Sequence, residues 1–181
     1  ISIWNKVLIM ATNLEFIKSA SGTSVSSLDV TDCFSDTYDV YYFSLTKIKR
    51  ASADNFIFIR FLDSGGTVIS ASEYDHAQLE LRAYTTFNEG RQTGNNRISG
   101  ISYGSSNTSD IGGVSLYVYN PYDSSSYTFV QSQSSSFRAS NGGFGLKTIG
   151  VHKSAEQISG VRFQADGVNL DDIKVSVYGV K

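Results

Sequence analysis

Apolar and polar positions alternate along most of this chain, which is the pattern of β-strands with one buried face. The clearest case is residues 173–178 (IKVSVY), because the Ile and the two Val fall on one face and the polar residues on the other. Residues 38–48 (YDVYYFSLTKI) alternate in the same way. This second run predicts that Tyr41 and Phe43 are buried, and that Tyr42 lies on the opposite face.

Residues 56–62 (FIFIRFL) are apolar on both faces except for Arg60, which predicts a strand inside a sheet that is covered on both sides. Gly, Asn and Ser clusters separate the remaining runs and predict turns. Further strands are expected at residues 14–18, 25–30, 79–87, 97–103, 114–119, 127–139 (as one long strand or two), 146–152 and 161–164, and residues 67–70 follow a hairpin turn at 63–66. This pattern predicts an all-β fold: a single-domain antiparallel β-sandwich of jelly-roll type with about 9–11 short strands.

Two segments give a weaker pattern. In residues 71–81 the apolar positions have helical spacing, and Ser72 with Asp75 resembles a capping box. We therefore expect a short helical turn there, leading into the strand at 79–87. Residues 88–96 are polar and are expected to form a loop.

The length of 181 residues corresponds to one domain. The division expected is an N-terminal arm or edge strand at residues 1–10 and a β-sandwich at residues 11–181. Aromatic residues make up 13% of the chain and only one residue is Pro, which suits strands better than disorder.

The segment 1–10 (ISIWNKVLIM) is apolar but too short to span a bilayer, and it lacks the features of a signal peptide. Because the chain does not begin with Met, Met10 is a plausible start of translation. An apolar segment must be shielded from water, so we expect residues 1–10 to form either an edge strand of their own domain or an arm that docks on a neighbouring subunit. The candidate interface residues in this segment are Ile3, Trp4, Val7 and Leu8.

The formal net charge is −2, so the chain has no basic field for a nucleic-acid backbone, and neither a nucleic-acid partner nor membrane insertion is expected. Cys33 is the only cysteine and cannot form an internal disulfide. A lone cysteine next to Phe34 is expected to be a small buried hydrophobic residue, in a protein that suits a reducing cytosol.

The sequence shows no catalytic set. His76 and His152 are the only histidines, and no Gly-x-Ser-x-Gly motif accompanies them. No His-x-x-x-His or cysteine pair could bind zinc. The acidic turn 166–172 could hold calcium or could be a turn stabilised by its own side chains, and the second interpretation is favoured. We therefore expect a non-enzymatic protein without a cofactor or metal.

Tyrosines are concentrated on the strongest predicted strands and one turn. Those on outward positions can pack a second sheet, anchor a protein interface or stack on a sugar. Tyr42, Tyr119 and Tyr122 are the candidate interface residues, and Tyr122 and Tyr127 are candidate glycan contacts. The glycan site would include the predicted loops 88–96, 104–113 and 120–126.

Several segments, in this order, resemble a family of virion structural proteins of tailed bacteriophages, seen especially often in phages of marine bacteria. The similar segments are residues 38–41, 56–61, 63–66 leading to 72–75, 119–122, 150–153 and 173–181. The resemblance extends over most of residues 12–181 and does not include residues 1–9. It implies a jelly-roll-type fold, often trimeric, displayed on the particle surface, and it carries no catalytic residues.

The leading expectation is therefore a non-enzymatic virion protein, assembled in the host bacterial cytoplasm and exposed on the particle as a head decoration (cement) or fibre subunit, or as a tail fibre. Its partners would be other virion proteins and copies of itself, in a homotrimer. The alternative is a receptor-binding adhesin module that binds host-surface glycan. No motif distinguishes a location on the head from one on the tail.

Overall fold

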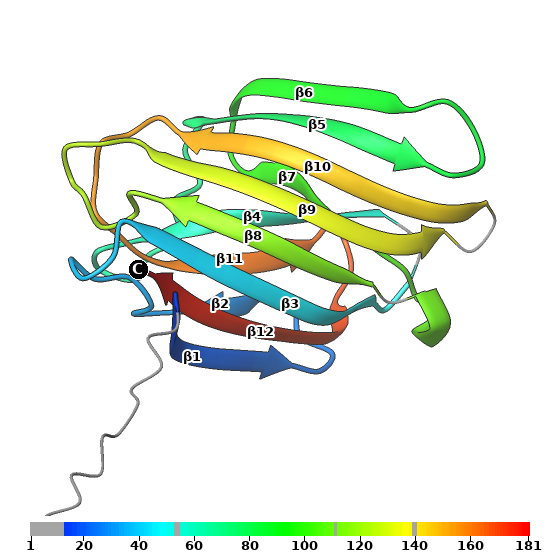
Figure 1. Ribbon diagram of the computed structural model, residues 1–181, viewed down its shortest axis with the longest axis horizontal. Coiled ribbons are helices and arrows are strands. Elements are labelled where there is room, and N and C mark those ends of the chain that lie inside the picture. The colour runs from blue at the N-terminus through cyan, green and yellow to red at the C-terminus, as the bar shows by residue number, and fades with distance from the viewer. Residues whose placement is uncertain (1–12, 53–54, 111, 139–140) are drawn as a thin grey trace, which may run out of the picture.

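Two antiparallel β-sheets pack face to face in the computed structural model, which describes residues 13–52, 55–110, 112–138 and 141–181 (Figure 1). The large sheet has eight strands in the order β1 (Leu14–Gly22), β12 (Leu170–Val180), β3 (Val40–Arg50), β8 (Gly113–Tyr119), β9 (Thr128–Arg138), β10 (Gly142–His152), β5 (Tyr74–Arg82) and β6 (Asn88–Asn95). The small sheet has four, in the order β2 (Leu28–Val30), β11 (Ile158–Ala165), β4 (Asn55–Asp63) and β7 (Ile98–Gly104). The predicted all-β fold and β-sandwich are confirmed.

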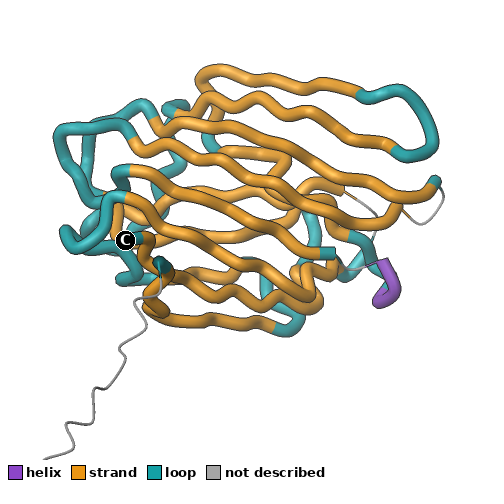
Figure 2. The backbone as a smooth tube through the Cα atoms, viewed as in Figure 1, coloured by secondary structure: helices purple, strands orange, loops and turns teal. Residues whose placement is uncertain are grey.

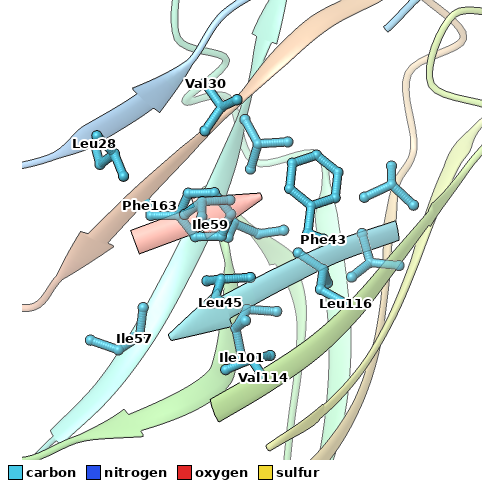
Figure 3. Close-up of a cluster of buried hydrophobic side chains, with 14 of the residues drawn as sticks. Leu28, Val30, Phe43, Leu45, Ile57, Ile59, Ile101, Val114, Leu116 and Phe163 are labelled. Atoms are coloured by element: carbon cyan, nitrogen blue, oxygen red, sulfur yellow. The ribbon is translucent and has the colours of Figure 1, made fainter. Parts of the chain in front are cut away.

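The hydrophobic core fills the space between the two sheets. Figure 3 shows Phe43 and Leu45 of β3 with Leu116 of β8 facing Ile59 of β4 and Phe163 of β11. All five side chains are fully or almost fully buried. The alternation read from residues 41–45 and 173–178 is confirmed, because both runs supply the large-sheet half of this core with Tyr41, Phe43, Leu45, Ile173, Val175 and Val177.

The small sheet has a second buried face, as the apolar run at 56–62 predicts. Phe58 points away from the core but is only 4% exposed. The guanidinium groups of Arg60 and Arg97 cover its ring, with centroid distances of 5.1 and 4.3 Å. The outer face of β4 is thus closed by arginine side chains rather than by another layer of secondary structure.

The helical turn expected in residues 71–81 is wrong. Residues 74–82 form β5 instead, so the strand expected at 79–87 begins and ends five residues earlier, and it pairs with β10 on one side and β6 on the other. Tyr74 is fully buried, and its hydroxyl donates to the backbone oxygen of Ile69 and accepts from the backbone N–H of Phe61. Asp75 accepts from the backbone N–H of Gly94 across the sheet instead of capping a helix. Tertiary contacts therefore override the local helical spacing.

The loop expected at residues 88–96 is also wrong, because residues 88–95 form the edge strand β6. Most of its side chains are exposed, so no alternation marks it in the sequence. With β6 included the described residues form twelve strands, slightly more than predicted. Figure 2 shows strands through most of the fold, loops gathered at two ends and one short helical turn, Thr108–Asp110. Among the described residues no helix is long and apolar enough to cross a membrane.

Candidate functional site

The outer face of the large sheet, turned toward the viewer in Figure 1, carries a continuous row of directly opposed residues across all eight strands. On β1, β12, β3 and β8 this row is aromatic. From β1 to β6 its members are Phe16, Tyr178, Tyr42, Tyr117, Gln131, Ile149, Ala77 and Arg91. Each lies on the face opposite to the core, because its chain neighbours are the inward residues.

A second row runs beside the first, two residues along each strand. Its members are Leu14, Val180, Val40, Tyr119, Phe129, Val151 and Asp75. We call the two rows together the apolar band. Eleven of its fifteen members are aromatic or large aliphatic residues, which is unusual for the outward face of a sheet that borders solvent.

The aromatic part of the band is a packed cluster. The Tyr42 ring lies 5.1 Å from that of Tyr117 and 6.0 Å from that of Tyr178, measured between centroids. Phe16 meets Tyr178 edge-on at 5.7 Å. These contacts hold the rings in place while leaving much of their surface in solvent: Phe16 is 58% and Tyr117 36% exposed. Ordered but exposed aromatic rings suit a preformed interface, because little side-chain freedom remains to be lost on binding.

The centre of this face is uncharged. From Val40 to Thr46 on β3, and along all of β8 and β9 to Phe137, the outward positions are apolar, Ser, Thr, Gln or Gly, and the structure describes every one of them. Charges such as Lys174 on β12 and Glu89 on β6 lie around this centre, and Lys147 of β10 borders it directly opposite Gln133 of β9. An apolar centre with polar surroundings is the usual composition of a protein interface.

The face is large enough for a stable interface. Eight strands about 4.8 Å apart span roughly 38 Å, and four outward residues per strand span roughly 27 Å, so the area is on the order of 1,000 Å². A standard interface buries about 800 Å² on each partner. Near the β6 edge the face is hollowed by a depression of about 570 Å³, lined by Phe129, Ile149 and Val151 among others.

Of the interface residues predicted from the sequence, Tyr42 and Tyr119 lie in the apolar band. Tyr122 does not, because it lies in the turn between β8 and β9. The other predicted interface residues, Ile3, Trp4, Val7 and Leu8, lie outside the described residues. Four further members of the band were not predicted from the sequence: Phe16, Tyr178, Phe129 and Ile149. Alternation could have placed each of them on an outward position, but only the register of the strands brings them together.

The predicted glycan loops do not converge. Residues 104–113 and 120–126 lie at opposite ends of β8, and 88–95 is an edge strand. Tyr122 lines a hollow of about 200 Å³ at the β8–β9 turn, together with Tyr38, Asp39 and Asn120. Tyr127 is exposed but is not part of that lining.

A polar cleft of about 300 Å³ lies between β6 and the small sheet, with His76, Gln78 and Arg91 in its lining. Burial, together with the positive charge of Arg97, lowers the pKa of His76. Arg97 itself makes two hydrogen bonds of 2.8 and 2.9 Å to the carboxylate of Asp166, whose pKa these bonds lower.

The acidic turn 166–172 has its carboxylates paired with separate cations. Asp166 binds Arg97, and Asp171 lies 2.8 Å from Lys49 Nζ and accepts a hydrogen bond from Ser24. Lys49 and Ser24 together lower the pKa of Asp171. The turn is therefore held by ion pairs and side-chain hydrogen bonds, and its oxygens do not gather around one point.

One group of side chains in the described part of the chain could hold a metal ion: Glu73, His152 and Glu156. No motif in the sequence marks this group, because 79 residues separate Glu73 from His152. His152 is fully buried and lies 3.2 Å from Glu73 and 3.6 Å from Glu156, measured from Nε2 to the carboxylate oxygens.

Compared with protein-family models, with curated proteins and with solved structures, the chain shows no match. The site therefore rests on the geometry of this chain.

Proposed function

We propose that this protein is a non-enzymatic structural subunit of a tailed-bacteriophage particle, exposed on the particle surface as a head decoration or fibre subunit or as a tail fibre, and that it assembles with copies of itself through the apolar band. The phage assignment rests on the sequence resemblance. The mode of assembly rests on one observation, the mostly aromatic and aliphatic band that crosses the large sheet from β1 to β10.

A second copy of the chain is the occupant that this face fits best. Its centre on β3, β8 and β9 is uncharged and therefore compatible with its own copy, whereas a charged partner would leave its charges unpaired against the tyrosines. Because the face is on the order of 1,000 Å² by strand spacing, two copies would bury more than a standard interface. Packing of this face on itself gives a two-fold dimer.

The finer features implied by the resemblance, a jelly-roll topology and a homotrimer, are part of the proposal. A trimer requires a second surface on each subunit in addition to the apolar band. A stiff sandwich with one buried thiol and no need for disulfides also suits assembly in a bacterial cytoplasm.

The test is light scattering on the purified full-length chain over a range of concentrations, for the wild type, Phe129→Lys and Phe87→Lys. Phe129 is 45% exposed in the band, and Phe87 is 63% exposed in the turn between β5 and β6. The wild type and Phe87→Lys are expected to form the same oligomer, and Phe129→Lys a smaller one, because it loses the contact through the apolar band. A wild-type monomer at all concentrations, or an unchanged Phe129→Lys oligomer, would refute assembly through this face.

Glycan binding is the second candidate, and the hollow around Tyr122 favours it. An exposed tyrosine beside carboxylate and amide groups offers a stacking surface and hydrogen-bond partners for a sugar. Titration of neutral and acidic monosaccharides, followed by tyrosine fluorescence, should show saturable binding that Tyr122→Ala removes. Equal responses of the wild type and Tyr122→Ala would rule out this hollow.

A further inference from the structure

The cluster of Glu73, His152 and Glu156 is built from three separate segments. Glu73 immediately precedes β5, His152 is the last residue of β10, and Glu156 lies in the connection to β11. The pairing of β5 with β10 places His152 opposite Tyr74, and the backbone N–H of Lys153 continues this ladder by donating to the backbone oxygen of Glu73 at 2.8 Å. Backbone hydrogen bonds between the two strands therefore fix the positions of Glu73 and His152 relative to one another.

The imidazole of His152 is held in one orientation. Its ring lies 4.8 Å from that of Tyr74 and 6.0 Å from that of Phe61, between centroids, and the side chain has no exposed surface. The Nε2 atom points at both carboxylates. The glutamate side chains are 39% and 34% exposed, so an ion could enter from solvent while the nitrogen ligand stays rigid.

Negative charge in this cluster is not balanced by a lysine or arginine. Lys153 is the neighbouring cation, but its Nζ lies 2.8 Å from Asp75 and so pairs outside the cluster. His152 is the sole partner of Glu73 and Glu156 among the side chains of the described residues. One Nε2–H group donates to one carboxylate at a time, so the second carboxylate is left without a donor.

The distances match those around a small tetrahedral ion. Zinc binds His nitrogen and carboxylate oxygen at about 2.0–2.2 Å, which places two neighbouring ligand atoms about 3.4 Å apart. The Nε2–oxygen distances of 3.2 and 3.6 Å bracket this value, and all three ligand atoms lie within 4.8 Å of one another.

We propose that Glu73, His152 and Glu156 bind a divalent transition-metal ion of the Zn²⁺ type, with water in the remaining position. One imidazole and two carboxylates suit zinc better than calcium or magnesium, which take oxygen ligands. The ion would join the β5–β10 pair to the connection that leads into the small sheet. The site takes an ion on a single chain, so it stands independently of assembly through the apolar band.

Binding is expected to be weaker than in a structural zinc site. The other ring nitrogen of His152, Nδ1, is buried and has no hydrogen-bond partner. A ligating histidine usually donates this second N–H to an acceptor, which orients the ring and strengthens the ligand. Here aromatic packing supplies the orientation and no acceptor strengthens the nitrogen.

The experiment uses the full-length chain, freed of metal with a chelator and then titrated with ZnCl₂ in a calorimeter. Variants Glu156→Gln and Glu73→Gln each remove one ligand at a partly exposed position and leave the buried histidine untouched. Glu89→Gln, an exposed glutamate on β6, is the matched control. Parallel titrations with CaCl₂ test whether the imidazole is a ligand.

One zinc ion per chain is expected, with a rise in Tm on binding, at least tenfold weaker binding in both cluster variants and no change in Glu89→Gln. Anomalous scattering at the zinc edge should place the ion among the three side chains. Three results would overturn the proposal. They are the absence of saturable zinc binding, which means that the cluster is only a His–Glu contact, equal affinity in Glu156→Gln, or calcium binding as tight as that of zinc.

Discussion

Ile149 is the most revealing position at which to perturb the apolar band. It lies on β10 between Gln131 of β9 and Ala77 of β5, and its side chain is 60% exposed, so most of its apolar surface is still available for a partner. Lysine at this position keeps a long aliphatic stem over the sheet and adds a charge within the proposed interface. Valine keeps the β-branched shape and loses one methylene.

The exposed fraction sets the size of the effect. Burying a whole Ile side chain contributes about 1.5–3 kcal/mol, so the 60% of Ile149 that is exposed would contribute about 1–2 kcal/mol in each copy of a two-fold dimer. Losing this in both copies weakens the dimer by about 2–4 kcal/mol, or roughly 30- to 700-fold in Kd. An unpaired lysine charge adds several kcal/mol more, so Ile149→Lys should raise Kd by at least about 100-fold.

Ile149→Val should raise Kd by only about 3- to 20-fold, because a buried Ile-to-Val change costs about 0.5–1.5 kcal/mol, scaled here by exposure and doubled by symmetry. Sedimentation equilibrium over a concentration series measures each Kd. Thermal unfolding of the monomers checks that stability changes by no more than about 0.5 kcal/mol, as is usual for a surface position. Equal Kd values for Ile149→Lys and wild type would show that the partner does not cover this strand.

Three further predictions follow from other parts of the chain. Burial raises the pKa of Cys33 to about 12, so its thiol should resist a disulfide reagent at pH 8 in the native protein and react fully in denaturant. Burial lowers the pKa of His76 from 6.5, so below that pH the imidazole is protonated more fully in the unfolded chain than in the folded one. The free energy of unfolding, measured with urea, should therefore fall as the pH drops below about 6.5, and it should fall less steeply in His76→Gln. If residues 1–10 are the anchoring arm, deleting them should abolish attachment of the protein to the particle and leave its circular dichroism spectrum unchanged. Attachment of the shortened chain at the wild-type level would reject that role.

Most of the fold follows from alternation in the sequence. Where one face of a strand meets the core and the other meets solvent, as at 173–178, period-two patterning determines both the strand and its inward face. The run at 56–62 also behaves as predicted, although arginine side chains cover its second face. These features depend on local composition, and the burial of each residue follows from its neighbours in the chain.

The predictions for residues 71–81 and 88–96 are wrong because the structure of both segments is determined by contacts with distant parts of the chain. Residues 74–82 have helical spacing by coincidence, and their strand is fixed by ladders to β10 and β6 and by the hydroxyl of Tyr74. Residues 88–95 have little apolar content and are a strand only because β5 offers an unpaired edge. The Glu73–His152–Glu156 cluster could not be predicted from the sequence either, because 79 residues separate Glu73 from His152 and only the β5–β10 pairing brings them together.

The apolar band combines both kinds of information, and this is the strongest argument that it has a function. Alternation places Tyr42, Tyr117 and Tyr178 on outward positions, where a solvent-exposed strand would carry polar residues. Each tyrosine alone is unremarkable, because scattered exposed aromatics are common. The strands come from three distant parts of the chain, yet their registers bring the three rings directly opposite one another. Core packing explains the inward residues of these strands and places no demand on the outward ones. An outward row of aromatic residues at the same level of adjacent strands, where polar residues are expected, therefore supports the proposal that another molecule covers this surface.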